Sequence, residues 1–480
     1  FLLLAAMLGA SLRHATKALG AARRGYACCH WMDVSHVEDS ETIWEVWNSR
    51  LKYGYGALEE VGQDAGVLLD QVAARSGNTK GTRVAVFTDR NQADLPHVHK
   101  VLEGLKKEGL ETTLYADVQV EPTDVSFKDA TAFATQGKFD AFVSVGGGSV
   151  MDTCKAANLY ASYPPADGDF LTYINPPIGK GTPPPGELKP HIACPTTSGT
   201  GSENTGISVF DLLEMKAKTG IVHNRLRPSL AVLDPSVMDT LPSAVVAASG
   251  FDVLSHAMES YTARSYRTRP KPDVASKRPS SQGSNPWSDL GCISALEKGG
   301  EFIVRACTDP SDSEAKEQLF FAAAMAGIAF GNAGCHLPHA MSYSVSGLCK
   351  DYVLDGFPES HPMVPHGVSV ILNAPSVFRF TAQANPTRHL AAARALGVSE
   401  SELRGIDHRD AGELLAGRII ELMKAAKYVP NGLNGVGYTA TDAPALTKGA
   451  YPQKRLVDNA PLPVSTEQME GLFTNAMKYW

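Results

Sequence analysis

Three consecutive glycines and a serine, residues 146–149, stand between a short apolar run and a segment of helical character. Residues 140–145 are typical of a buried strand, and the segment VMDTCKAANLY after Ser149 is typical of a helix. Glycine lets the backbone approach a pyrophosphate closely, and a helix N-terminus offers free N–H donors. A plain glycine-rich turn is the alternative, but the flanking strand and helix favour phosphate binding.

The chain before this loop alternates between strand and helix patterns. Residues 83–88 (RVAVFT) and 112–116 (TTLYA) are short β-rich runs. Between them, from Val98 to Leu105, apolar residues follow helical spacing, and residues 126–136 form a second helical stretch. This alternation predicts a parallel sheet with crossover helices, the α/β architecture.

After about residue 240 the pattern changes to long helical periods, and strand patterns become scarce. The predicted helices cover residues 243–263, 289–306, 313–330, 389–395 and 411–426. We therefore expect an α/β dinucleotide-binding domain at residues 33–240 and an all-α, metal-binding domain at residues 241–480.

The first 32 residues form a separate segment. They begin with 12 apolar residues, fewer than the ~20 that cross a bilayer, and carry four Lys/Arg and no Asp or Glu. This composition predicts a mitochondrial transit peptide at residues 1–32, with a truncated secretory signal or an ordinary chain terminus as alternatives. Eight cysteines without a CxxC pair indicate reduced thiols, which favours the mitochondrial matrix over secretion.

Composition limits the partners. Lys and Arg number 44 against 51 Asp and Glu, so the net charge of −7 does not favour nucleic-acid binding. Hydrophobic residues at 43% and charged residues at 20% exclude a disordered or collagen-like chain. We expect small-molecule partners, no nucleic acid, no membrane and a homo-oligomer.

Two carboxylates accompany the glycine loop. Asp89 follows the first predicted strand, where it could hydrogen-bond a ribose diol and repel a 2′-phosphate, which favours NAD over NADP. On its own, an aspartate there is more often a turn residue. Asp152 lies three residues after Ser149, and the pair resembles a helix-capping arrangement. The loop is not GxGxxG, so the usual dinucleotide fingerprint is absent.

A second polar loop, CPTTSGTGSEN at residues 194–204, follows another β-type run, HIAC. Its hydroxyl groups, those of Thr196, Thr197 and Thr200 among them, could donate to phosphate or ribose oxygens. A flexible Ser/Gly linker is the alternative, and it fits poorly because a strand leads straight into the loop.

One carboxylate and three histidines in the predicted helical domain form the most specific pattern. They are Asp252, His256, His339 and His366. The first two are four residues apart on one predicted helix and therefore share a face. Such a set suits a divalent first-row metal, Fe(II) or Zn(II). Each histidine alone is more often a core or surface residue, and spacing does not separate His336 and His361 from the ligands.

Taken together, these motifs resemble the iron-containing alcohol dehydrogenase family. The resemblance rests on GGGSVMDTCKAAN, PTTSGTGSE, GFDVLSHAMES and the histidine of PHG. It implies an N-terminal α/β dinucleotide domain and a helical C-terminal domain with the metal between them, the fold shared with dehydroquinate synthase. Stretches such as KYGYGALEEVG and HAMSYSVSG extend the resemblance from about residue 50 to the C-terminus, toward a mitochondrial branch that moves hydride between hydroxy and oxo acids.

The resemblance implies a role for each matching residue. Metal ligands fall on Asp252, His256, His339 and His366, with Fe(II) first and Zn(II) second. Cofactor positions fall on Asp89, Gly147, Gly148, Ser149, Thr196 and Thr200, with Lys218 as a cofactor-side lysine. Many members have a further histidine four residues after the third ligand, where this chain has Tyr343. Tyr343 is therefore the candidate catalytic residue, provided that its phenol reaches the substrate or the ribose.

The implied reaction oxidises 4-hydroxybutyrate to succinic semialdehyde and reduces 2-oxoglutarate to 2-hydroxyglutarate through bound NAD. Both substrates are carboxylates, so a cation should line the pocket, with Lys350, Arg264 and Arg267 as candidates. The alternatives are an NAD-dependent iron alcohol dehydrogenase with an exchangeable cofactor, a dehydroquinate-synthase-like lyase, and a non-catalytic NAD- or metal-binding module.

Overall fold

The computed structural model describes residues 40–215, 217–358 and 362–480. The predicted transit peptide and His361 lie outside these ranges. No single described helix is long and apolar enough to cross a membrane; by length and composition alone, one pair of helices bent by 103° meets that test together.

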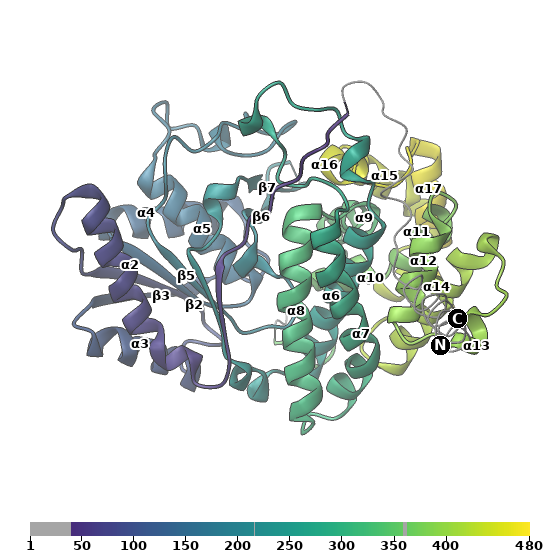
Figure 1. Cartoon of the computed structure of the whole chain (residues 1–480), viewed down its shortest axis with the longest axis horizontal. Helices are drawn as coiled ribbons and strands as arrows, with labels where there is room; N and C mark the ends of the chain where they lie inside the picture. The colour runs from purple at the N-terminus through teal and green to yellow at the C-terminus, as the bar shows by residue number, and fades with distance from the viewer. Residues whose placement is uncertain (1–39, 216, 359–361) are drawn as a thin grey trace, which may run out of the picture.

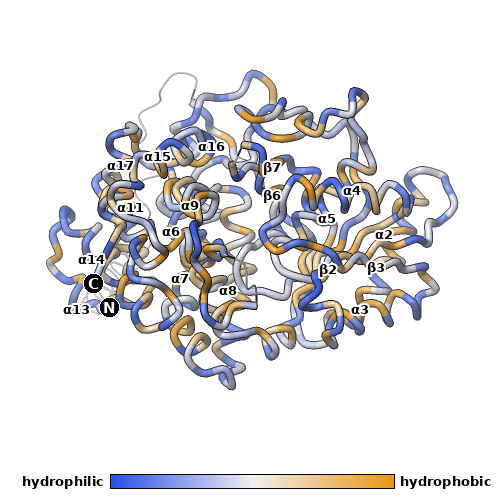
Figure 2. Tube along the Cα trace, turned by 180° about the vertical axis from the view of Figure 1, so that it is seen from behind, coloured by the Kyte–Doolittle hydropathy of each residue, from blue (hydrophilic) through white to orange (hydrophobic). Residues whose placement is uncertain are grey.

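A six-stranded sheet in the order β1-β8-β5-β4-β2-β3 organises the N-terminal half, and every neighbouring pair is parallel (Figure 1). The strands are β1 (Arg50–Tyr53), β2 (Arg83–Asp89), β3 (Glu111–Val118), β4 (Ala141–Gly146), β5 (His191–Pro195) and β8 (Leu230–Leu233). Figure 2 shows apolar residues concentrated along this sheet. The predicted parallel sheet is therefore confirmed.

Helices cover both faces of the sheet because successive side chains of a strand point to opposite faces. On β2, Val84 and Val86 join the core that includes helices α2 (Val61–Ser76) and α3 (Pro96–Lys107). Phe87 joins a separate core with helices α4 (Asp124–Gly137) and α5 (Gly148–Ser162). Burial on both sides explains why the central strands are almost continuously apolar.

A two-stranded antiparallel hairpin, β6 (Ile207–Leu212) and β7 (Ala217–Val222), follows the second polar loop. Sequence patterns did not predict it. The hairpin matters for the site because β7 carries Lys218.

From Ser243 onward, every named element of the described chain is helical. Helix α6 (Ser243–Thr262) packs against α7 and α8, which run beside it in Figure 1, and most of its residues are buried. The remaining α-helices are α7 (Pro286–Thr308), α8 (Ser313–Ala333), α9 (Leu337–Gly347), α10 (His366–Ile371), α11 (Ala374–Thr381), α12 (Pro386–Ala395), α13 (Glu400–Leu403), α14 (Ala411–Ala425), α15 (Ala443–Ala450), α16 (Lys454–Val457) and α17 (Thr466–Asn475). The predicted combination of an α/β half and a helical half is confirmed.

The start of α5 differs from the capping arrangement suggested by its sequence. Gly147 is the N-cap and makes no side-chain hydrogen bond, so Ser149 lies inside the helix. Asp152 instead accepts hydrogen bonds from Ser202 Oγ at 2.5 Å and from Val209 N at 2.9 Å. Its carboxylate therefore ties α5 to the second polar loop and to β6 rather than capping the helix.

Candidate metal and dinucleotide site

A cavity of about 590 Å³ separates the carboxyl edge of the sheet from helices α6, α9 and α10. The strand topology explains part of it, because the ends of parallel strands β2, β4 and β5 meet at one edge. Every residue predicted from the sequence to bind the cofactor or the metal lines this cavity, as does Tyr343.

The predicted metal ligands converge on one carboxylate oxygen. Asp252 Oδ1 lies 3.7 Å from His256 Nε2, 3.5 Å from His339 Nε2 and 3.8 Å from His366 Nε2. Four atoms at ~2.1 Å from a shared tetrahedral ion would be about 3.4 Å apart. Among the described residues, Asp252, His339 and His366 have ligand atoms that all lie within 4.8 Å of one another, a spacing that suits one small divalent ion. His256 lies near Asp252 but falls in a different group, with Cys335 and His339, so it would have to move to complete a four-ligand site.

Unsatisfied donor atoms support the same interpretation. Asp252 Oδ1 and His339 Nε2, which face each other, are buried and have no hydrogen-bond partner in the described part of the chain. On His256 the atom without a partner is Nδ1, not the Nε2 that faces Asp252. Buried polar atoms are normally hydrogen-bonded, so a group of orphans in one place calls for a ligand. One carboxylate with imidazole nitrogens fits Fe(II) or Zn(II).

Electrostatics prepare these side chains for a cation. Burial raises the pKa of Asp252, but the neighbouring imidazoles, His256 first, lower it more, so the net shift is downward. Burial lowers the pKa of His256 to about 3 and also lowers that of His366. At neutral pH the carboxylate is therefore ionised, and these two imidazoles are neutral with free lone pairs.

Glu259 orients the third histidine. It lies on α6 and is fully buried, and its Oε1 is 2.6 Å from His339 Nδ1. The other oxygen, Oε2, accepts a hydrogen bond from His336 N at 2.7 Å. Burial lowers the pKa of His339, but the Glu259 carboxylate raises it more, so Nδ1 holds a proton and Nε2 faces Asp252.

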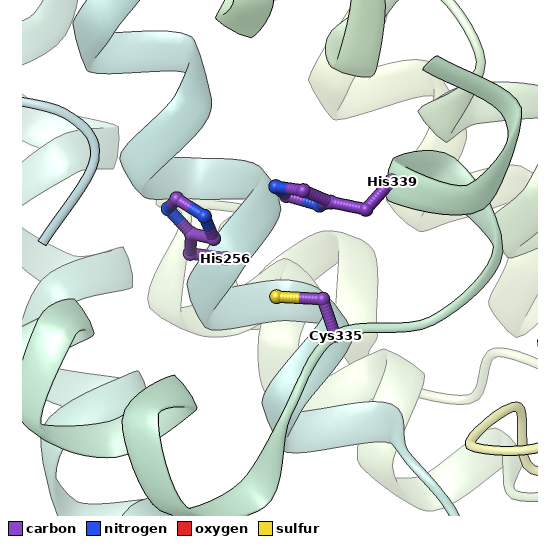
Figure 3. A group of neighbouring side chains, drawn as sticks. All are labelled: His256, Cys335 and His339. Carbon is purple, nitrogen blue, oxygen red and sulfur yellow. The ribbon is translucent and has the colours of Figure 1, made fainter. Parts of the chain in front are cut away.

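Cys335 and His336 lie beside the cluster and differ in role. Figure 3 shows Cys335 with its sulfur toward the rings of His256 and His339, and these three residues form a second group of potential ligands. Burial raises the pKa of the Cys335 thiol, so it is a weaker ligand than Asp252. His336 caps α9 through Nδ1, and its Nε2 is 3.0 Å from Thr262 Oγ1, which excludes it from the cluster.

The two polar loops pack directly against each other. A Cβ on Gly148 would lie 2.6 Å from Thr200 Cγ2, so only glycine allows this approach. Ser149 Oγ accepts a hydrogen bond from Glu121 N at 3.2 Å. Gly147, Gly148 and the threonines therefore form one wall of the cavity, at the N-terminus of α5.

Asp89, the last residue of β2, lines the same cavity. It is 5% exposed, and it accepts hydrogen bonds from Asn91 N at 2.9 Å and from Gln92 Nε2 at 2.5 Å. Gln92 Oε1 in turn accepts from Thr196 Oγ1 at 2.6 Å. Gln92, which sequence reasoning missed, thus links the end of β2 to the second polar loop.

Lys218 lines the cavity, but two neighbouring carboxylates already balance its positive charge. Its Nζ lies 2.6 Å from Glu121 Oε2 and 3.2 Å from Asp211 Oδ1. Burial lowers the pKa of Lys218, yet the two carboxylates raise it well above its usual value. The ammonium group is therefore permanently charged and held in place by two acids.

Tyr343 is buried on α9, four residues after His339, and lines the same cavity. Its hydroxyl makes no hydrogen bond with another described residue. The phenol is therefore available to a bound molecule.

Relatives that match over more than nine-tenths of their length share nearly half of the sequence. A Xenopus laevis protein named hydroxyacid-oxoacid transhydrogenase, mitochondrial, is 48% identical over 92% of this chain and 92% of its own length. The human protein of that name is 47% identical over 92% and 91%. The prediction of a mitochondrial location is confirmed by this naming.

Solved structures share the fold. A 1,3-propanediol oxidoreductase matches with a TM-score of 0.75 and 26% identity, over 90% of this chain and 100% of its own. An iron-containing alcohol dehydrogenase from Thermococcus thioreducens matches with a TM-score of 0.72 and 25% identity, over 91% and 99%.

Family assignment agrees with both comparisons. The family model described as "Iron-containing alcohol dehydrogenase" matches residues 49–235. The model described as "Fe-containing alcohol dehydrogenase family, C-terminal" matches residues 279–477. Together they cover both halves of the fold. The chain thus belongs to the iron-containing alcohol dehydrogenase family, a family of metal- and NAD(H)-binding oxidoreductases.

Proposed function

We propose that this protein is a hydroxyacid-oxoacid transhydrogenase that oxidises 4-hydroxybutyrate to succinic semialdehyde and reduces 2-oxoglutarate to 2-hydroxyglutarate. The observation that carries the proposal is one cavity lined both by the four residues predicted to bind a metal and by the glycine- and threonine-rich loops. Relatives that match more than nine-tenths of the chain bear the name of this activity.

The two half-reactions balance. The hydroxy acid loses a hydride from its carbinol carbon and a proton from its hydroxyl group, and the oxo acid gains both. When bound, NAD accepts and returns the hydride, while a divalent metal polarises the substrate oxygen. No nucleotide is consumed, provided that it stays in the cavity between the two half-reactions.

The chain's own residues bind and orient these groups. We assign the metal to Asp252, His256, His339 and His366, with Fe(II) as the first choice and Zn(II) as the second. We assign NAD to the cavity wall, with Asp89 at the adenosine ribose; the other positions are Gly147, Gly148, Ser149, Asp152, Thr196, Thr197, Thr200 and Lys218. Tyr343 holds the proton that leaves or joins the substrate oxygen.

We also retain two broader assignments as proposals. Residues 33–240 act as the dinucleotide-binding domain and residues 241–480 as the metal-binding domain. The chain works as a homo-oligomer, which light scattering on a size-exclusion column would test.

An isotope experiment tests the proposed activity. Deuterium on C4 of 4-hydroxybutyrate should appear on C2 of 2-hydroxyglutarate, even with excess unlabelled NADH in solution. His256→Ala, which removes one metal ligand, should abolish this transfer. Appearance of the label in the free NADH pool would instead support an ordinary iron alcohol dehydrogenase with exchangeable NAD, the second candidate.

A further inference from the structure

The cavity holds one positive charge without an acidic partner. Apart from histidines, the cationic side chains that line it in the described chain are Lys218 and Arg455. Lys218 is paired with Glu121 and Asp211. Arg455 has no ion pair and no hydrogen bond with any described residue. Arg455 is half-buried, and a guanidinium that faces a cavity without an acidic partner is suited to an anionic ligand.

Arg455 lies at the metal end of the cavity. Its helix, α16, packs against α9, which carries His339 and Tyr343. Arg455 lines the same cavity as Cys335, and Cys335 belongs to a ligand group with His256 and His339.

The cations suggested by the sequence are placed elsewhere. None of Lys350, Arg264 and Arg267 lines the cavity. Lys350 lies 3.1 Å from Asp442, and Arg264 donates to Thr268 Oγ1 at 3.1 Å. Arg267 donates to Tyr266 Oη at 3.0 Å. The substrate carboxylate therefore needs a different partner.

We infer that Arg455 binds the carboxylate of the substrate and so selects hydroxy acids over neutral alcohols. This inference rests on the proposed function, because it assigns a partner to the charged end of its substrates. The planar guanidinium can donate two parallel hydrogen bonds to a carboxylate, a geometry that a lysine cannot supply. Half-burial of Arg455 beside the cavity strengthens such a pair relative to a surface one.

Substrate pairs separate this role from a structural one. Arg455→Met should lower kcat/KM about 10- to 100-fold for 4-hydroxybutyrate, while 1,4-butanediol, which is neutral and has the same chain length, should be little affected. Arg455→Lys should lower kcat/KM for 4-hydroxybutyrate less than Arg455→Met does. Lys454→Met is the matched control, because Lys454 is exposed, lies over the Tyr451 ring at 3.7 Å and does not line the cavity.

A binding measurement keeps the two proposals distinguishable. Succinate, an unreactive dicarboxylate, should stabilise the metal- and NAD-loaded enzyme against heat, and Arg455→Met should remove that effect. If the wild-type enzyme bound succinate through Arg455 but did not oxidise 4-hydroxybutyrate, the proposed function would fail and the carboxylate site would stand. Equal losses on both substrates, or loss of bound NAD in Arg455→Met, would overturn the inference.

Discussion

Glu259 fixes the orientation of His339, one of the proposed metal ligands. It contacts His339 through one oxygen and the backbone of His336 through the other, and its side chain is fully buried on α6. A carboxylate behind a ligating histidine fixes the tautomer of the ring and raises its basicity. The nitrogen of His339 that faces Asp252 is therefore set by Glu259, a residue outside the proposed ligand set.

Replacing Glu259 should weaken metal binding without removing a ligand. In Glu259→Gln, the amide cannot carry the negative charge that favours a protonated Nδ1, so we expect a 10- to 100-fold loss of metal affinity. Chelator competition with metal analysis would measure it. Glu203→Gln is the control, because Glu203 is equally buried but does not line the cavity. Equal metal affinities for Glu259→Gln and wild type would show that the charge of Glu259 does not contribute to metal binding.

Sequence patterns identify the proposed metal ligands more readily than the residues that orient them. The spacing of Asp252 and His256 on one helix predicted a shared face, and they do line one cavity. Glu259 lies three residues after His256, a spacing that could have indicated a second polar contact on the same face. Nothing in the sequence around Gln92 or Arg455 distinguishes them from surface residues. The position of Gln92 depends on the turn between β2 and α3, and that of Arg455 depends on how α16 docks.

At the scale of elements, the cluster depends on how closely α10 approaches α6. A Cβ on Gly367 would lie 1.9 Å from Ala248 O and 2.8 Å from Asp252 Cβ, distances that no side chain tolerates. Gly367 directly follows His366 at the start of α10. The glycine therefore lets α10 bring His366 next to the Asp252 carboxylate.

Gly367→Ala should push α10 away from α6. We expect a loss of ~1–3 kcal/mol in the free energy of unfolding, because the clash involves backbone, together with weaker metal binding as His366 moves. Urea unfolding and metal analysis would measure the two effects. Gly417→Ala, on α14 where a Cβ meets nothing within 4 Å, should be neutral or stabilise by ~0.5–1 kcal/mol. Equal unfolding free energies and metal binding for the two variants would show that α10 does not need to approach α6 this closely.

Elements with strong local periodicity were predicted within a few residues. The helix expected at residues 243–263 is α6 (Ser243–Thr262), and the strand expected at residues 83–88 is β2 (Arg83–Asp89). Strands β1 and β8, four residues each, and the β6–β7 hairpin were missed. Short strands carry too few residues to display a period, and their pairing is set by distant partners.

At the scale of the whole molecule, the buried residue Glu203 lies where the two halves of the fold meet. Glu203 lies in the short helix Ser202–Asn204, and its backbone carbonyl accepts a hydrogen bond from Ser49 Oγ at 2.6 Å. A Cβ on Gly327 of α8 would be 3.4 Å from Glu203 Oε1, so the carboxyl group lies against the helical half. Burial raises the pKa of Glu203 to about 7.

This shifted pKa should make the stability of the whole protein depend on pH. Folded Glu203 keeps its proton up to about pH 7, whereas the unfolded chain releases it near its ordinary pKa of 4.5. Between these values the folded state binds more protons, so this residue's contribution to stability falls as pH rises, by ~1.4 kcal/mol per pH unit and roughly 3 kcal/mol in total. Below pH 4.5 and above pH 7 the contribution is constant.

Glu203→Gln should remove this dependence, because an amide has no proton to lose in this range. The difference in unfolding free energy between Glu203→Gln and wild type is therefore expected to grow in favour of the variant from pH 5 to pH 7 and then to level off. Urea unfolding at each pH would measure it, with Glu103→Gln, a change at an exposed glutamate of α3, as the control. A difference that is the same at every pH would mean that the Glu203 carboxyl group ionises equally in the folded and unfolded chains.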